Sequence, residues 1–171
     1  MVTPNNKELK MKETDFIVSK TDVKGLITYC NDAFMEFSGY YEEDLIGQAH
    51  NIIRHPDMPR SVFRLMWQTL QQENEFFGFI KNMCKNGGFY WTFANVTPSF
   101  SADNQLTGYF SVRRFPVPEG IETLQALYQE MSEIEASITN SQDAMDASIT
   151  ILNNAVQDKG GYNEFICSFY R

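Results

Sequence analysis

The sequence predicts an α+β domain with an antiparallel sheet of about five strands, short helices on one face, and a further helix at the C-terminus. Three observations predict this class. Two short apolar runs near the start are separated by a turn that contains Gly25. Short helical patterns follow, and the domain then ends in aromatic and β-branched runs divided by polar turns. Helices that cover one face of such a sheet leave a concave space between the layers.

Each element has its own local evidence. The expected strands are residues 15–18, 26–29, 76–84, 89–98 and 106–115. Asn31 is a favourable N-cap for a helix that Gly39 ends, and a second short helix over residues 42–46 is closed by Gly47. After a polar loop over residues 48–59, Pro59 starts a helix through about residue 72 with apolar residues at helical spacing.

Pro116 and Pro118 mark a boundary after the last strand. The expected division is an N-terminal cap segment (1–14), the α+β domain (15–118), an amphipathic helix (119–158) and a terminal docking segment (159–171). The helix carries an apolar seam at three- and four-residue spacing, interrupted by Glu135 and Gln142. The seam consists of Ile121, Leu124, Tyr128, Met131, Ile138, Met145, Ile149, Leu152 and Val156. It suits either packing on its own domain or pairing with a second chain as a homodimer.

Composition excludes several classes of protein. No stretch approaches the ~20 apolar residues of a membrane span, and the polar start is not a signal peptide. The cysteines, Cys30, Cys84 and Cys167, are odd in number and widely spaced, which argues against a disulfide framework or a zinc site. We therefore expect a cytoplasmic protein with no direct membrane insertion and no metal site.

Charge is unevenly distributed. Residues 1–118 hold 12 Lys and Arg against 13 Asp and Glu, whereas residues 119–171 hold 2 against 9. An acidic C-terminal region repels nucleic acid and anionic lipid, so nucleic acid is not an expected partner. A basic surface or another helix is the better match.

Motifs of common enzymes are missing from the sequence. There is no phosphate-binding P-loop, dinucleotide-binding glycine motif, zinc-protease helix motif or nucleophile elbow. The histidines are His50 and His55, and no local pattern makes either one part of a catalytic triad. We expect a protein that is not an enzyme.

The densest cluster of polar residues is the loop Arg54-His55-Pro56-Asp57-Met58-Pro59. An Arg side chain suits phosphate or carboxylate, and unpaired N–H groups at the start of the following helix would add to such a site. A structural role is the alternative, with Asp57 capping the helix and His55 on the surface. The residues alone leave both interpretations open.

Taken together, these segments resemble a PAS domain. The resemblance rests on the early hairpin, Asn31-Asp32-Ala33-Phe34, Ser38-Gly39-Tyr40, the 54–59 loop, Trp67, Lys81-Asn82, Lys85-Asn86-Gly87, Tyr90-Trp91 and Gly108-Tyr109. It covers about residues 15–115 and is most similar to the FAD-binding PAS domain of aerotaxis (energy-taxis) receptors.

The resemblance implies a set of residues that bind FAD. These are Arg54, His55, Asp57, Trp67, Asn82, Asn31, Phe76 and Arg113. Asn82 corresponds to the amide that flavin-binding PAS and LOV domains place against the pyrimidine edge of the flavin, where it can donate and accept. Phe76 stands where the aerotaxis pattern has a second Trp. Arg113 aligns with a glutamine beside the flavin in LOV domains, although one residue of register would turn Arg114 inward instead.

The resemblance also implies a function. We expect a stand-alone FAD-binding redox sensor for energy taxis (aerotaxis) that signals to a separate transducer of the HAMP-containing, methyl-accepting chemotaxis type. The photoreactive cysteine motif of LOV domains is absent, so we expect no light-driven adduct. We expect the redox signal to pass through the last strand (106–115) to the helix after Pro118. FMN is a less favoured cofactor, and the rival functions are a haem-binding gas sensor that uses His50 or His55 and a cofactor-free dimerisation adaptor.

Overall fold

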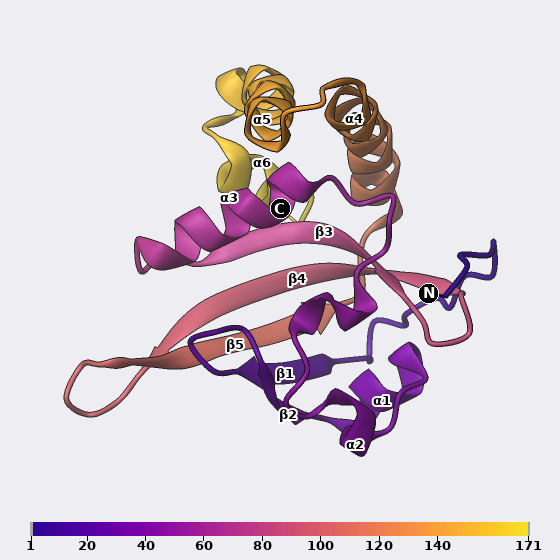
Figure 1. The fold of residues 1–171 in the computed structure, drawn as a ribbon, viewed down its shortest axis with the longest axis vertical. Coiled ribbons are helices and arrows are strands. Elements are labelled where there is room, and N and C mark those ends of the chain that lie inside the picture. The colour runs from indigo at the N-terminus through magenta and orange to yellow at the C-terminus, as the bar shows by residue number, and fades with distance from the viewer. Residues whose placement is uncertain (1, 171) are drawn as a thin grey trace.

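The computed structural model describes residues 2–170, which form a five-stranded antiparallel sheet with helices around it (Figure 1). The strand order is β2-β1-β5-β4-β3. The strands are β1 (Ile17–Thr21), β2 (Ile27–Cys30), β3 (Phe76–Met83), β4 (Phe89–Phe100) and β5 (Leu106–Arg114). All five expected strands are present, and the predicted α+β class is confirmed.

The helices between β2 and β3 lie close to their expected positions. They are α1 (Asp32–Ser38), α2 (Glu42–Leu45), the 3₁₀ helix η1 (His50–Ile53) and α3 (Arg60–Gln71). Asn31 caps α1 by accepting the N–H of Phe34, and Gly39 ends it in the left-handed conformation. The expected loop over residues 48–59 contains η1, a single turn that the Pro and polar composition did not indicate.

The alternation of side chains across the sheet defines two faces. Ile80 and Asn82 on β3, Ala94 on β4, and Ser111 and Arg113 on β5 line a cavity on one face. We call this the inner face. The neighbouring residues Phe79 and Phe93 pair across β3 and β4 on the other, outer face.

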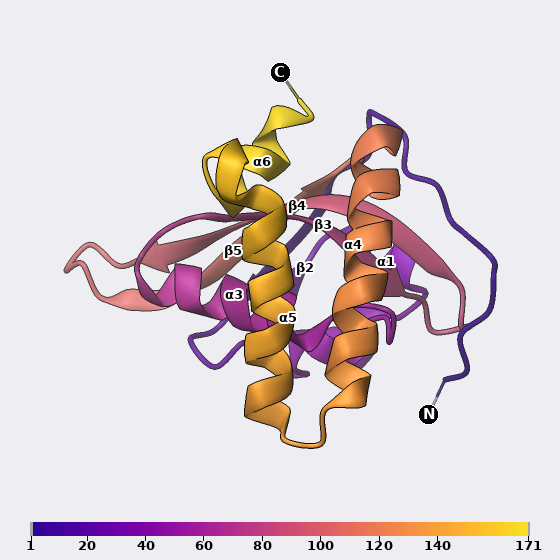
Figure 2. The same ribbon diagram turned by 90° about the horizontal axis from the view of Figure 1, so that it is seen from above.

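The expected single helix over residues 119–158 is wrong. The chain forms two antiparallel helices instead, α4 (Pro118–Ser137) and α5 (Ser141–Val156), which lie side by side in Figure 2. The break occurs because Ile138 leaves the helical conformation and the Asn140 side chain caps α5, accepting the N–H groups of Gln142 and Asp143. We call this pair the C-terminal hairpin. It packs on its own domain, one of the two arrangements that the seam allowed.

The C-terminal helices also correct the expectation that helices cover one sheet face. The start of α4 and the residues after α6 (Tyr162–Ser168) pack on the outer face, where Gly120 meets the Phe79 ring and Phe169 and Tyr170 contact Phe79. At its own start, α6 stacks Tyr162 on Phe76 at the edge of the sheet. On the inner side, α5 packs against α3. The C-terminal region therefore wraps around β3, an edge strand that would otherwise offer free backbone groups.

Polar contacts complete the cover of this edge. Asn163 of α6 accepts the backbone N–H of Phe77 and donates to the carbonyl of Glu75. Of the predicted terminal docking segment (159–171), the described residues 159–170 contact β3, with a short 3₁₀ turn η2 (Gln157–Lys159) leading into α6, and residue 171 lies outside the described residues. The N-terminal segment runs beside the β3–β4 turn, where Lys7 and Leu9 exchange backbone hydrogen bonds with Phe89.

Candidate functional site

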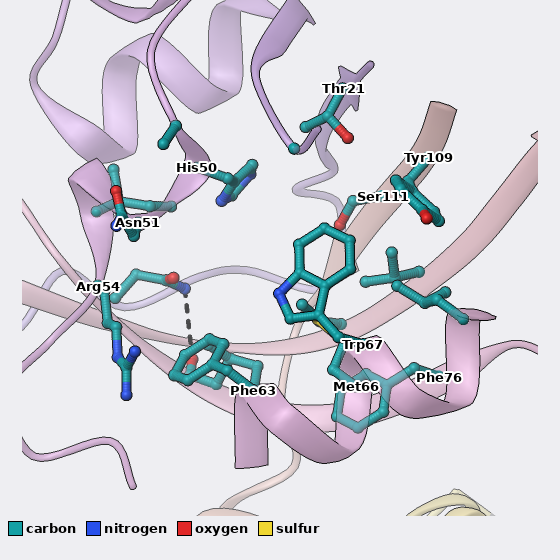
Figure 3. A pocket seen from close by; sticks show the side chains of 18 of the residues that line it. Thr21, His50, Asn51, Arg54, Phe63, Met66, Trp67, Phe76, Tyr109 and Ser111 are labelled. Carbon is teal, nitrogen blue, oxygen red and sulfur yellow. Dashed lines mark hydrogen bonds between the residues drawn. The ribbon is translucent and has the colours of Figure 1, made fainter. Parts of the chain in front are cut away.

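A cavity of about 390 Å³ lies between the inner face of the sheet, η1 and α3 (Figure 3). Its size falls in the ~300–1,000 Å³ range of small-molecule sites. Its lining residues are Thr21, Lys24, Gly25, Ala49, His50, Asn51, Ile53, Arg54, Phe63, Met66, Trp67, Leu70, Phe76, Ile80, Asn82, Ala94, Val96, Tyr109, Ser111 and Arg113. The sheet supplies one wall, and α3 supplies the opposite one.

The α3 wall is aromatic and apolar. Successive turns of α3 present Phe63, Met66, Trp67 and Leu70 because these positions recur at helical spacing. Figure 3 shows the Trp67 indole standing in the cavity, and its ring meets Tyr109 of β5 edge-on at 5.2 Å. Flat walls of this kind suit a flat aromatic ligand.

A polar cluster of Arg113, His50 and Ser19 closes one end of the cavity. Arg113 is 4% exposed, and its Nη2 donates to His50 Nε2 at 2.6 Å and to Ser19 Oγ at 3.1 Å. Burial lowers the pKa of Arg113 to about 10, so the guanidinium keeps its charge at neutral pH. The strand register thus turns Arg113 inward, while Arg114 is exposed on the outer face.

Burial and the nearby Arg113 charge lower the pKa of His50 to about 3. The neutral imidazole can therefore accept the hydrogen bond from Arg113. This pair places a positive charge at the cavity wall and leaves Nε2 of His50 occupied.

Several buried polar atoms near this end have no partner among residues 2–170. They are Arg113 Nη1, Ser111 Oγ and the Tyr90 hydroxyl. An unsatisfied buried donor or acceptor costs about 1–3 kcal/mol, so a ligand that pairs with these atoms would be stabilised there. Asn82 is 4% exposed, and its amide donates only two long hydrogen bonds, at 3.4 Å, to Ile80 and Thr92.

The charge of the cavity wall has one sign. Lys24, Arg54 and Arg113 line it, and no Asp or Glu appears among the described lining residues. Such a wall attracts anionic or electron-rich groups. The structure therefore indicates a ligand with a flat aromatic part, hydrogen-bonding edges and negative charge.

The conspicuous 54–59 loop is divided between the two sides of the β3 edge. Arg54 lines the cavity and stacks on the Phe63 ring at 4.2 Å. His55 is 3% exposed, lies against Phe89, and accepts the N–H of Asp57. The Asp57 carboxylate pairs with Lys81 at 2.6 Å. His55 and Asp57 therefore fix the loop that carries Arg54 and do not line the cavity.

Asn31 also lies away from the cavity lining, contrary to its expected role in binding a cofactor. Its amide oxygen accepts the N–H groups of Val18 and Phe34, and its amide nitrogen donates to the Phe16 carbonyl. These bonds join β1 to the start of α1. Of the expected site residues, the structure brings Arg54, Trp67, Phe76, Asn82 and Arg113 to one cavity.

The expected phosphate site at the start of α3 is also corrected. The N–H groups of Arg60 and Ser61 donate to the Glu135 carboxylate of α4 at 2.9 and 3.0 Å. The helix start is therefore capped by the C-terminal hairpin.

Sequence reasoning missed part of the cavity wall. Tyr109 and Ser111 share the inner face with Arg113 at two-residue spacing, and this alternation could have identified them. For His50, the sequence suggested a role only in the rival haem site. Its pairing with Arg113, 63 residues away in the chain, depends on tertiary structure that no local pattern reveals.

The low pKa of His50 predicts a pH-dependent stability. The unfolded chain takes up this proton near pH 6.5, whereas the folded protein resists it until about pH 3, so the stabilisation is complete above pH 6.5 and is lost as the pH falls. Between pH 7 and 5 the loss attributable to His50 is about 2 kcal/mol. Urea unfolding at pH 7 and pH 5, with both proteins stripped of ligand, should show a smaller loss of unfolding free energy in His50→Gln than in the wild type. Equal losses in the two proteins would contradict the neutral assignment.

Residues 2–170 contain no helix long and apolar enough to cross a membrane. The same residues contain no group of three or more His, Cys, Asp or Glu side chains placed to hold a metal ion.

Comparisons with known proteins agree with this architecture. The chain is 39% identical over 131 residues to the aerotaxis receptor of Escherichia coli, a match that covers 77% of this chain and 25% of the receptor. It is 27% identical over 158 residues to a nitrogen fixation regulatory protein of Klebsiella pneumoniae, covering 91% of this chain and 31% of that protein. The chain thus spans about a quarter to a third of the length of these relatives.

Solved structures share the fold at lower identity. A PAS domain from Colwellia psychrerythraea has a TM-score of 0.54 and 22% identity, and the match covers 59% of this chain and 86% of that one. The light-state structure of the Aureochrome1 LOV domain has a TM-score of 0.57 and 14% identity, with coverage of 69% and 92%. The sequence pattern of the PAS fold matches residues 27–113. The chain belongs to the PAS fold family.

Proposed function

We propose that this protein is a flavin-binding PAS sensor, with FAD as the cofactor, that reports redox state to a separate signalling partner. The observation that carries the proposal is the cavity, which combines an aromatic α3 wall, a cationic lining and buried polar atoms without partners. Similarity to the PAS region of an aerotaxis receptor supports energy taxis as the setting.

The residues present fit a flavin. Trp67, Phe63 and Phe76 offer flat apolar surfaces for the ring system, and Asn82 offers an amide for its polar edge. The orphaned Nη1 of Arg113 and Oγ of Ser111 could pair with flavin heteroatoms, and Lys24 and Arg54 with phosphate. When bound, the flavin would supply the electron-transfer chemistry, and the protein would bind, orient and shield it.

The haem alternative fits the histidines poorly. Nε2 of His50 is engaged by the Arg113 guanidinium at 2.6 Å, so an iron would have to displace a buried cation. The His55 ring is packed against Phe89, and its Nδ1 accepts a backbone N–H. A cofactor-free adaptor would leave the orphaned atoms near Arg113 unpaired.

We further propose that the role is sensory and not catalytic. The ionisable groups at the polar end of the cavity are held in place, with His50 neutral and paired to Arg113. The partner in this proposal is a HAMP-containing transducer of the methyl-accepting type on another polypeptide. The acidic C-terminal hairpin, with Glu122, Glu130 and Asp143 exposed, would favour a basic contact surface on it.

The test is the identity of the bound cofactor. Protein expressed with flavin available should be yellow, and chromatography after denaturation should release FAD. Ala94→Leu should reduce the amount of flavin bound per protein, because the larger side chain extends into the cavity. Ala126→Leu, on the exposed side of α4, should leave that amount unchanged. Release of FMN alone, a haem absorption band, or colourless protein would each contradict FAD binding.

A further inference from the structure

The C-terminal hairpin has two ends of different chemical character. Its base is apolar, with Leu124, Tyr128, Leu152 and Val156 buried in the main core. Its tip, over residues 132–148, buries Glu135, Ala144 and Ser148. The base is therefore held by the hydrophobic effect, whereas the tip depends on polar contacts.

Glu135 makes the central contact of the tip. Its carboxylate accepts the backbone N–H groups of Arg60 and Ser61, and the Arg60 Nε lies 3.3 Å from it. The side chain is 6% exposed. Burial alone would raise the pKa of Glu135, but hydrogen bonds from Ser61 and Arg60 outweigh it and lower the pKa. The group is thus a charged cap on the first turn of α3.

Further polar bonds join the tip to α3. Ser61 and Ser148 share a hydrogen bond of 2.7 Å, and Arg64 donates to Asp146 at 2.6 Å. Arg64 makes this single bond while its Nε and Nη1 are buried without partners among the described residues. Polar contacts with incomplete pairing resemble the interfaces between domains that move relative to each other.

The helix that receives the tip is also a wall of the cavity. One face of α3 bears Ser61 and Arg64 toward α5, and another bears Phe63, Met66 and Trp67 toward the cavity. Because α3 is a rigid element of 12 residues, a change that moves its cavity face also moves its first turn relative to the hairpin.

We propose that Glu135 is a positioning residue that latches the tip of the C-terminal hairpin to α3, so that docking of the tip is coupled to occupancy of the cavity. The base stays in place while the tip opens locally. This inference rests on the proposed function, which supplies the cavity ligand. It places the output at the α3 side of the domain, whereas the sequence suggested a route through the last strand.

Hydrogen exchange of the full chain tests the latch. Glu135→Gln removes the charge that caps α3, and exchange at residues 132–148 should become about tenfold faster or more, since hydrogen bonds to charged groups are the stronger ones. The base and the strands β3 to β5 should keep their protection. Glu130→Gln is the matched control because Glu130 is exposed on the same helix.

Arg60→Met provides a second variant that leaves the core intact. It removes the bonds from the Arg60 side chain to Glu135 and Ser141 while the backbone cap remains, so the effect should be smaller and in the same region. Exchange at the tip that is equal in Glu135→Gln and Glu130→Gln would overturn the latch.

Flavin titration tests the coupling. Because linkage is reciprocal, loosening the tip should change the flavin dissociation constant of Glu135→Gln by roughly fivefold or more relative to Glu130→Gln. A faster-exchanging tip with unchanged flavin affinity would overturn the coupling. If no variant binds flavin, the proposed function and the coupling both fail, and the exchange data still decide the latch.

Discussion

Truncation of the chain after Pro118 is expected to leave little soluble, folded protein. It removes α4, α5 and α6, which supply buried apolar side chains to the main core. These are Leu124, Tyr128, Met131, Leu152, Val156 and Ile166. It also uncovers Phe79, which is fully buried, and Phe93, which is 8% exposed, on the outer face of the sheet.

The expected size of this effect follows from burial. Each fully buried apolar side chain contributes about 1.5–3 kcal/mol to stability. The loss of several such side chains is therefore comparable to the whole free energy of unfolding of a domain, ~5–15 kcal/mol. The loss of Asn163 adds free backbone groups at the edge of β3, which favours edge-to-edge association.

The measurement is the yield and melting temperature of the truncated protein by size exclusion and circular dichroism. Deletion of residues 2–4 is the control, since that segment is almost entirely exposed and lies outside the cores. A truncated protein that stays soluble, melts like the full chain and loses only self-association would show that the hairpin pairs between chains instead.

Local signals predicted the elements of the sheet domain because their causes are local. The Asn31 cap and the Gly39 stop bound α1. Asn82 was assigned to the site by the resemblance to flavin-binding PAS and LOV domains, and the structure places it in the cavity lining. The break between α4 and α5 was hidden because Ile138 and Met145 continue the seven-residue spacing across it. The available signal was Asn140, a strong N-cap inside the supposed helix.

Glu135 shows why a sequence pattern can be detected and misinterpreted. Within the seam it had the appearance of a defect in a pairing helix, but it is the cap of α3, 74 residues away from Ser61. The 54–59 loop is similar, since its residues were assigned to one ligand although only Arg54 lines the cavity. Such pairings arise from tertiary packing, which spacing along one chain does not specify.

If the cavity holds flavin as proposed, Arg113→Gln is expected to lower the midpoint potential of that flavin. The Arg113 cation lines the cavity with an orphaned Nη1 and no carboxylate among the described lining residues. A fixed positive charge stabilises an anionic reduced flavin more than the neutral oxidised form, and its removal reverses that preference. Unit charges ~4 Å apart interact by about 4 kcal/mol at an effective dielectric constant near 20. Removal of the Arg113 charge should therefore take away a substantial part of that stabilisation of the reduced flavin.

For a two-electron couple, ~1.4 kcal/mol corresponds to ~30 mV, so the expected decrease is about 30–90 mV. Flavin should remain bound because the aromatic wall and Asn82 are unchanged. Arg114→Gln is the matched control, since it removes the same charge from the exposed outer face one residue away. Spectroelectrochemical titration should therefore separate the two variants. Equal potentials in both would mean that the inward orientation of Arg113 does not tune the cofactor, and the charge of the cavity wall would then serve binding alone.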